Sequence, residues 1–180
     1  QLDLKFEKEN ELKFSDYIQM IKYKTAVLLG SSLKMGGIIN DVNETDLESL
    51  YDIGLNLGLA FQIQDDYLDL FGDQNLIGKK IGGDIIKRKK TVMYHVFKEI
   101  SNEGDSLTLD QLYNDSNSDD GSKIQKVFEL FKNANVDVKT KDLVKNYSTK
   151  AINSLENLNI ENDKKSELIQ ICNKLISRDF

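Results

Sequence analysis

The amino-acid sequence predicts an all-α fold. Its 180 residues include no proline, although average usage of about 5% would give roughly nine. Proline breaks helices, so its absence over a chain of this length favours helices throughout. Apolar residues also recur at helical spacing over long stretches. With 39% hydrophobic residues, the chain is long enough to form one domain, residues 1–180, with a sizeable core.

Composition also limits the classes of function. The net charge of −6 argues against general nucleic-acid binding. A single cysteine, Cys172, cannot form an intramolecular disulfide and indicates a reducing compartment, so we expect a cytoplasmic protein. The sequence has neither a signal peptide nor an apolar run of about 18 residues, so we expect no transmembrane segment.

The first long helix is expected to begin at a Ser15 cap and to continue to about Ile39. Its apolar residues follow helical spacing, and Lys24 and Thr25 lie inside it. From these residues alone, Lys24 is read as a solvated lysine on an amphipathic helix.

A long central helix is expected next, over residues 46–71. The turn at residues 40–44 precedes it, and residues 45–48 have the Thr-x-x-Glu pattern of a capping box. Gly54 and Gly58 lie four apart inside this helix. Because glycine lowers helix stability, their presence predicts a flat strip where another helix approaches closely.

The rest of the chain is expected to contain four more helices and one long loop. Thr91 opens a helix that reaches about Glu103 and includes His95, the single histidine, to which we assign no function. Residues 104–121 are polar and predict a mobile loop. Three further helices are expected over residues 122–134, 141–158 after a Thr140 cap, and 163–177.

Three carboxylates meet at the end of the central helix. Asp65 and Asp69 are four apart and share a face, with Asp66 beside them. Gly72 is a helix stop, so these carboxylates lie near the negative end of the helix dipole and repel one another. A divalent cation relieves both penalties, and Mg²⁺ suits oxygen ligands when a phosphate supplies the rest. A solvated acidic helix end is the alternative.

A basic segment follows the acidic cluster. Residues 79–90 contain six Lys or Arg side chains and one acid, a net charge of +5, which leaves −11 for the remainder of the chain. Carboxylates that hold a metal, followed by lysines that neutralise phosphate oxygens, predict a diphosphate site. The alternative is a basic surface loop for nucleic acid or anionic lipid. The neighbouring acidic cluster would repel such a polyanion in the absence of metal.

These residues resemble a known family. The stretch Phe-Gln-Ile-Gln-Asp-Asp-Tyr-Leu-Asp at residues 61–69 is followed by Phe-Gly-Asp, Gly-Lys, Gly-Gly-Asp-Ile and Lys-Lys-Thr. This order is similar to the second aspartate-rich region of the trans-isoprenyl diphosphate synthases, or polyprenyl synthetases. The resemblance covers nearly the whole chain and is strongest from about Lys22 to Thr91. It implies an antiparallel helical bundle of the isoprenoid synthase type, with two aspartate-rich regions facing each other across the mouth of a cavity.

The resemblance also implies residue roles. Asp65 would ligate Mg²⁺ on the allylic diphosphate, with Asp66 and Asp69 as supporting or water-mediated ligands. Thr25 and Gln62 match positions whose oxygens lie near the developing carbocation. The lysines that would hold the diphosphate are Lys24, Lys79 (with Lys80 as an alternative register) and Lys89, and Gln1 resembles a pocket-wall glutamine.

The chain also departs from the family pattern. The first aspartate-rich region and the Gly-Lys-x-x-Arg segment for isopentenyl diphosphate should lie upstream of Gln1. The chain begins without Met, as though inside an element, so we expect that a preceding portion is missing. By itself it would have half a metal site, and we expect it to be inactive alone. Gln74 stands where the family usually has proline.

The resulting hypothesis is a Mg²⁺-dependent trans-prenyltransferase. It would condense an allylic diphosphate with isopentenyl diphosphate through an allylic carbocation and release diphosphate. Family analogy implies a homodimer. Three alternatives remain: a non-catalytic subunit of a heteromeric synthase, a terpene cyclase of the same fold, and a plain helical interaction domain.

Overall fold

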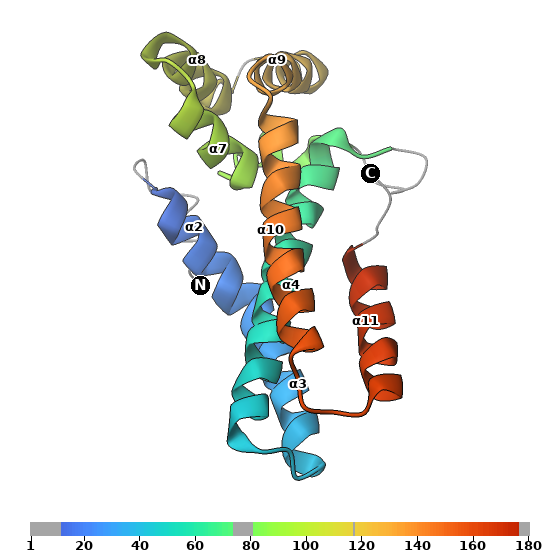
Figure 1. Ribbon diagram of the computed structural model, residues 1–180. Helices are drawn as coiled ribbons and strands as arrows, with labels where there is room; N and C mark the ends of the chain where they lie inside the picture. Colours follow the sequence, from blue (N-terminus) through green and yellow to red (C-terminus); the bar gives the residue numbers. More distant parts are fainter. Residues whose placement is uncertain (1–11, 74–80, 117, 177–180) are drawn as a thin grey trace. The chain divides into compact units, whose positions relative to one another are not determined.

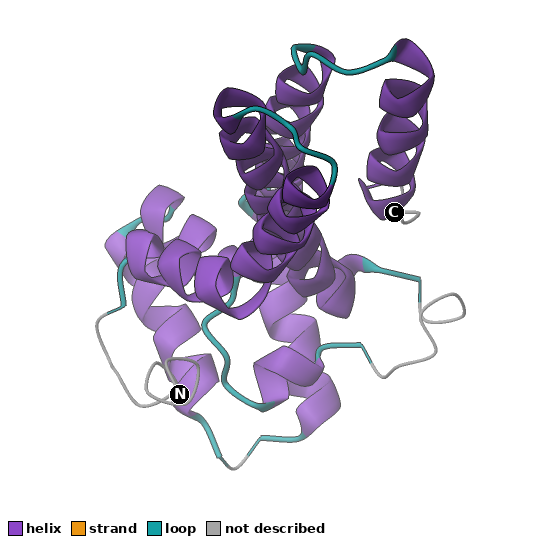
Figure 2. Ribbon diagram, turned by 90° about the horizontal axis from the view of Figure 1, so that it is seen from below, coloured by secondary structure: helices purple, strands orange, loops and turns teal. Residues whose placement is uncertain are grey.

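Every regular element in the described part of the chain is a helix, as the sequence predicted (Figures 1 and 2). The computed structural model describes residues 12–73, 81–116 and 118–176. None of the helices there combines the length and the apolar character that crossing a bilayer requires. The elements are α2 (Phe14–Ile21), η1 (Lys22–Ala26), α3 (Val27–Ile39), α4 (Glu44–Phe71), α6 (Gly83–Ile86), α7 (Val92–Ile100), α8 (Glu103–Asn114), α9 (Asp120–Asn133), α10 (Val136–Glu156) and α11 (Asn162–Ile176).

The first long helix differs from the prediction in its interior. It is helical from α2 to α3, but the segment between them, η1, is a π-helix. Short π segments inside α-helices occur often at functional sites, and this one contains Lys24 and Thr25. Its start also differs: Asp16 accepts a hydrogen bond from the Lys13 amide (3.1 Å), and Ser15 lies inside the helix.

Helix α4 has a different cap from the one predicted. The Asn43 side chain accepts a hydrogen bond from the Asp46 amide (3.0 Å) and donates one to the Asp46 carboxylate (2.7 Å). The first of these bonds satisfies a backbone amide in the first turn of the helix, so Asn43 is the cap, two residues before the predicted Thr45 cap. Asparagine caps helices at least as well as threonine, so the earlier start is favoured.

The predicted loop at residues 104–121 is wrong in its first part. Residues 103–114 form helix α8, whose start is capped by Asn102 through the Asp105 amide (2.9 Å). The buried residues of α8 are Leu109 and Tyr113. This apolar pattern is too sparse to predict a helix from the sequence. Thr140 is likewise not a cap, because it lies fully buried inside α10.

The structure divides into two compact units, which we describe separately. The second unit holds residues 18–64 and the described residues from 142 to 176. In it α3 and α4 run antiparallel (Figure 1), and their backbones approach closely at the predicted glycines. A Cβ on Gly54 would lie 2.5 Å from the Gly30 nitrogen, and one on Gly58 would lie 2.4 Å from the Ala26 Cα. The predicted flat strip therefore contacts η1 and α3.

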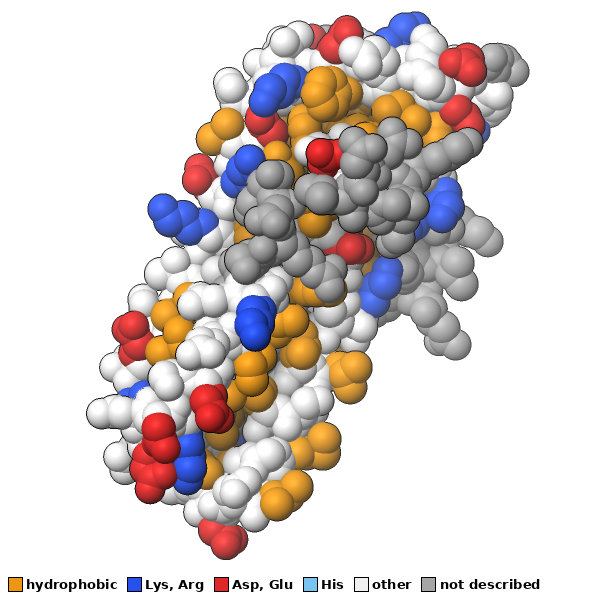
Figure 3. All heavy atoms as spheres, turned by 90° about the vertical axis from the view of Figure 1, so that its right-hand side faces the viewer, with side chains coloured by type: hydrophobic (Ala, Val, Ile, Leu, Met, Phe, Trp, Pro, Cys, Tyr) orange, Lys and Arg blue, Asp and Glu red, His pale blue; other side chains and the backbone are white. Residues whose placement is uncertain are grey.

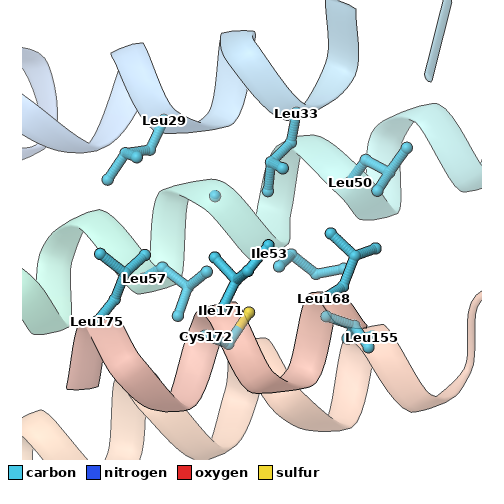
Figure 4. Close-up of a pocket in the computed structure, with 11 residues that line it drawn as sticks. Leu29, Leu33, Leu50, Ile53, Leu57, Leu155, Leu168, Ile171, Cys172 and Leu175 are labelled. Atoms are coloured by element: carbon cyan, nitrogen blue, oxygen red, sulfur yellow. The ribbon is translucent and has the colours of Figure 1, made fainter. Parts of the chain in front are cut away.

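The core of the second unit is aliphatic. Leu50, Ile53 and Leu57 of α4 pack with Ala151 and Leu155 of α10. Helices α3, α4, α10 and α11 leave a cavity of about 130 Å³ between them (Figure 4). Its lining consists of apolar side chains and one glycine, with the Cys172 thiol pointing toward it.

The first unit holds the described residues up to Tyr17 and those between 65 and 141. Its core is rich in aromatic rings from α4, α7, α8 and α9. Ring centroids are 5.5 Å apart for Phe97 and Phe131, and 5.0 Å apart for Tyr94 and Tyr113. Such contacts add to the energy of burial, and these two pairs hold α7 against α9 and α8.

We expect His95 to make the protein less stable in acid. It is only 4% exposed, and burial, followed by the nearby charge of Lys90, lowers its pKa from 6.5 to about 4. The unfolded chain therefore binds the extra proton first, and stability falls as the pH drops from about 6.5 towards 4, by up to about 3 kcal/mol.

Urea unfolding of the wild type and of His95→Leu across this pH range would measure the effect. Carboxylates titrate in both proteins, so the difference between the two curves isolates His95. The wild type should lose more stability than the variant, and parallel curves would contradict the assignment.

Candidate functional site

The three predicted aspartates lie in the last turns of α4, but their environments differ. The Asp65 side chain is exposed, Asp66 is buried and Asp69 is partly buried. Among the described residues, no three His, Cys, Asp or Glu side chains are placed so that they could hold a metal ion by themselves. The cluster therefore offers an exposed carboxylate beside two carboxylates that are held by the protein.

Asp66 is held by two donors on one oxygen. The Tyr17 hydroxyl donates to Oδ2 at 2.7 Å, and the Val92 amide donates to the same atom at 3.4 Å. Burial, and then the negative charge of Asp66, raises the pKa of Tyr17 well above 10. The phenol therefore remains protonated and acts as a donor at every physiological pH.

Asp69 is held by the Gly-Gly-Asp-Ile segment. Its Oδ2 accepts a hydrogen bond from the Asp84 amide (3.0 Å), and its carbonyl accepts one from the Gly82 amide (2.6 Å). Gly82 has φ 76°, and a Cβ there would lie 2.7 Å from Ile124, so glycine is required on both grounds. Burial raises the pKa of Asp69. This segment is thus folded onto the end of α4.

The described part of the basic segment continues from this contact. The Lys89 ammonium pairs with the Asp84 carboxylate at 2.8 Å, and Arg88 donates to the Ser116 hydroxyl at 2.7 Å. Asp84 thus links Asp69 to Lys89, a connection that the sequence did not reveal. The predicted site residues Lys79, Lys80 and Gln1 lie outside the described residues.

The remaining predicted site residues belong to the second unit. The Thr25 hydroxyl donates to the Gln62 side-chain oxygen at 2.8 Å, so the structure pairs the two residues predicted near a carbocation. Lys24 is exposed on η1. The pairing follows from the close approach of the helices one turn away, where Gly58 contacts Ala26.

The carboxylates fit Mg²⁺ only if another molecule supplies most of its ligands. Mg²⁺ commonly keeps several waters and uses one or two carboxylates together with phosphate oxygens. Asp65 has the exposure for direct ligation, whereas Asp66 and Asp69 already accept hydrogen bonds. This donor set fits a metal that arrives with a diphosphate.

The described residues on one face of the molecule show no concentration of basic side chains. On the face drawn in Figure 3, Lys and Arg side chains are interspersed with Asp and Glu, and hydrophobic side chains show between them. A nucleic-acid interface would instead collect basic side chains on one face.

Comparison with known proteins identifies the family. The polyprenyl synthetase family model matches residues 1–131. The chain is 34% identical over 163 residues to geranylgeranyl diphosphate synthase of Saccharolobus solfataricus, covering 89% of this chain and 48% of that protein. It is 36% identical over 132 residues to a short chain isoprenyl diphosphate synthase of Methanocaldococcus jannaschii, covering 73% and 39%.

Comparison with solved structures leads to the same family. A geranylgeranyl pyrophosphate synthase crystal structure matches with a TM-score of 0.91 at 37% identity, covering 100% of this chain and 56% of that one. The Pyrococcus horikoshii geranylgeranyl pyrophosphate synthetase matches with a TM-score of 0.88 at 31% identity, covering 99% and 53%. The chain spans about half the length of the curated relatives it matches. It has the all-α isoprenoid synthase fold and belongs to the polyprenyl synthetase family.

Proposed function

We propose that this chain forms the allylic diphosphate site of a prenyltransferase. The enzyme would join an allylic diphosphate to isopentenyl diphosphate, giving a longer polyprenyl diphosphate and free diphosphate. The observation that supports this best is the end of α4, where Asp69, the Asp84 amide and the Asp84–Lys89 ion pair form one connected group beside the exposed Asp65. A polyprenyl synthase of Caulobacter crescentus, 28% identical, has been solved with calcium and isoprenyl diphosphate.

Each residue has a physical task in this proposal. Asp65 would ligate Mg²⁺, with Asp66 and Asp69 supporting it, and the metal would stabilise the negative charge of the departing diphosphate. Lys24, Lys79 and Lys89 would neutralise phosphate oxygens. The Thr25 and Gln62 oxygens would steady the allylic cation without attacking it, as preorganised dipoles do. Lys24, Thr25, Gln62 and Lys89 are therefore the residues we propose for catalysis.

The remaining features of the proposal come from the family. The protein would work in the cytoplasm as a homodimer, and the 180-residue chain alone would bind diphosphate without turnover. Calorimetric titration with inorganic diphosphate, with and without Mg²⁺, tests the site. Binding that requires Mg²⁺ supports it, and the absence of any binding would favour a plain helical interaction domain.

Product analysis of the full-length protein distinguishes a synthase, a terpene cyclase and a subunit of a heteromeric synthase. Chain elongation that needs both an allylic diphosphate and isopentenyl diphosphate supports the synthase. Cyclic hydrocarbons formed from the allylic diphosphate alone would show a terpene cyclase. Turnover that appears only with a distinct co-purifying partner would show a subunit of a heteromeric synthase.

A further inference from the structure

The Asp-rich end of α4 is connected to a residue far away in the sequence. Tyr17 of α2 and Asp66 are 49 residues apart, yet the Tyr17 hydroxyl lies 2.7 Å from Asp66 Oδ2. Tyr17 is 2% exposed and Asp66 is 7% exposed. A hydrogen bond from a hydroxyl to a buried carboxylate is among the strong kinds, because the acceptor is charged and water does not compete well.

The phenol is itself fixed. Its ring lies 5.6 Å from the His95 ring and 6.2 Å from the Phe14 ring, centroid to centroid. The Val92 amide, at the start of α7, donates to the same Asp66 oxygen at 3.4 Å. The carboxylate is therefore held by donors from α2 and α7 that converge on one atom.

Two donors on one oxygen restrict the orientation of the Asp66 carboxylate. The terminal torsion of an aspartate side chain is broad and weakly restrained when nothing holds it. Two donors on Oδ2 fix the plane of the Asp66 carboxylate and, with it, the direction of Oδ1. Partners that orient a metal ligand in this way commonly change metal affinity by about 10- to 100-fold when they are removed.

We propose that Tyr17 is a positioning residue that orients Asp66 for binding of Mg²⁺ together with diphosphate. The inference rests on the proposed function of this site. Tyr17 touches neither substrate nor metal in this scheme, and it acts through the Asp66 carboxylate.

Tyr17→Phe tests the inference, because it removes the hydroxyl and keeps the ring. The measurement is a Mg²⁺ titration at a fixed concentration of inorganic diphosphate, which gives the apparent Mg²⁺ affinity. We expect this affinity to fall about 10-fold, with the helical circular dichroism retained.

Tyr94→Phe is the matched control. Tyr94 is also buried in the first unit, and its hydroxyl donates to a carboxylate, Asp110, at 2.6 Å. Asp110 lies outside the Asp-rich motif, so this variant should lose a similar hydrogen bond and similar stability without losing Mg²⁺ affinity. Equal losses of Mg²⁺ affinity in the two variants would overturn the positioning role.

A double-mutant cycle adds a second test. If Tyr17 acts through Asp66, Tyr17→Phe should have little further effect on Mg²⁺ affinity in an Asp66→Asn background. Full additivity would overturn the inference. Wild-type protein that fails to bind Mg²⁺ with diphosphate overturns the proposed function and this inference together, whereas wild-type binding that Tyr17→Phe leaves unchanged overturns the inference alone.

Discussion

Asp65→Ala is expected to abolish the Mg²⁺-dependent binding of diphosphate. Asp65 is the exposed carboxylate of the three at the end of α4, whereas Asp66 and Asp69 accept hydrogen bonds from the protein. Removing it takes away the carboxylate best exposed for direct ligation, and the supporting Asp66 and Asp69 carboxylates are too buried to replace it, so metal and diphosphate lose their main attachment. Calorimetric titration with inorganic diphosphate and Mg²⁺ measures the loss.

The fold should survive this substitution. Exposed side chains usually change stability by no more than about 0.5 kcal/mol, and removing a negative charge near a helix C-terminus is slightly favourable. Asp52→Ala is the control, because Asp52 is also an exposed aspartate on α4. It should bind diphosphate as the wild type does. Unchanged binding by Asp65→Ala would contradict the metal assignment.

Gly58→Ala is expected to cause a large loss of stability for the addition of a single methyl group. The new Cβ would lie 2.4 Å from the Ala26 Cα and 2.9 Å from the Ala26 Cβ. The first of these is a backbone atom that cannot rotate away, so η1 and α4 must separate. Overpacking of this kind costs about 1–3 kcal/mol or more, which exceeds the gain of about 1 kcal/mol from replacing glycine in a helix.

Gly36→Ala makes the same change where, apart from the backbone of its own helix and its two chain neighbours, nothing lies within 4 Å of the new Cβ. It should raise the free energy of unfolding by about 0.5–1 kcal/mol. Urea denaturation of both variants measures the contrast. Gly58→Ala with stability equal to the wild type would mean that the two helices do not approach as described. Because Thr25 and Gln62 meet one turn away, the destabilised variant should also lose that hydrogen bond.

The two elements that the sequence predicts incorrectly share a physical cause. Residues 103–114 carry no clear helical pattern, because Leu109 and Tyr113 are the buried side chains of α8. Two plausible caps for α4, Asn43 and Thr45, lie two residues apart, and the geometry of the turn selects Asn43. The sequence signal for a helix is weak at α8, and the signal for a cap occurs twice before α4. At both places the contacts made on folding determine the structure.

Four features can be predicted from the amino-acid sequence: the all-α class, the long central helix, its close contact at Gly54 and Gly58, and the family. They depend on local composition, on spacing along one helix and on an ordered motif, which are properties of consecutive residues. Three other features arise only when the chain folds: the Tyr17 hydroxyl reaches Asp66 across 49 positions, Asp84 connects Asp69 to Lys89, and a π turn forms at Lys24 and Thr25. The three carboxylates are equivalent in the motif, and they become different because each meets neighbours that folding brings from other parts of the chain.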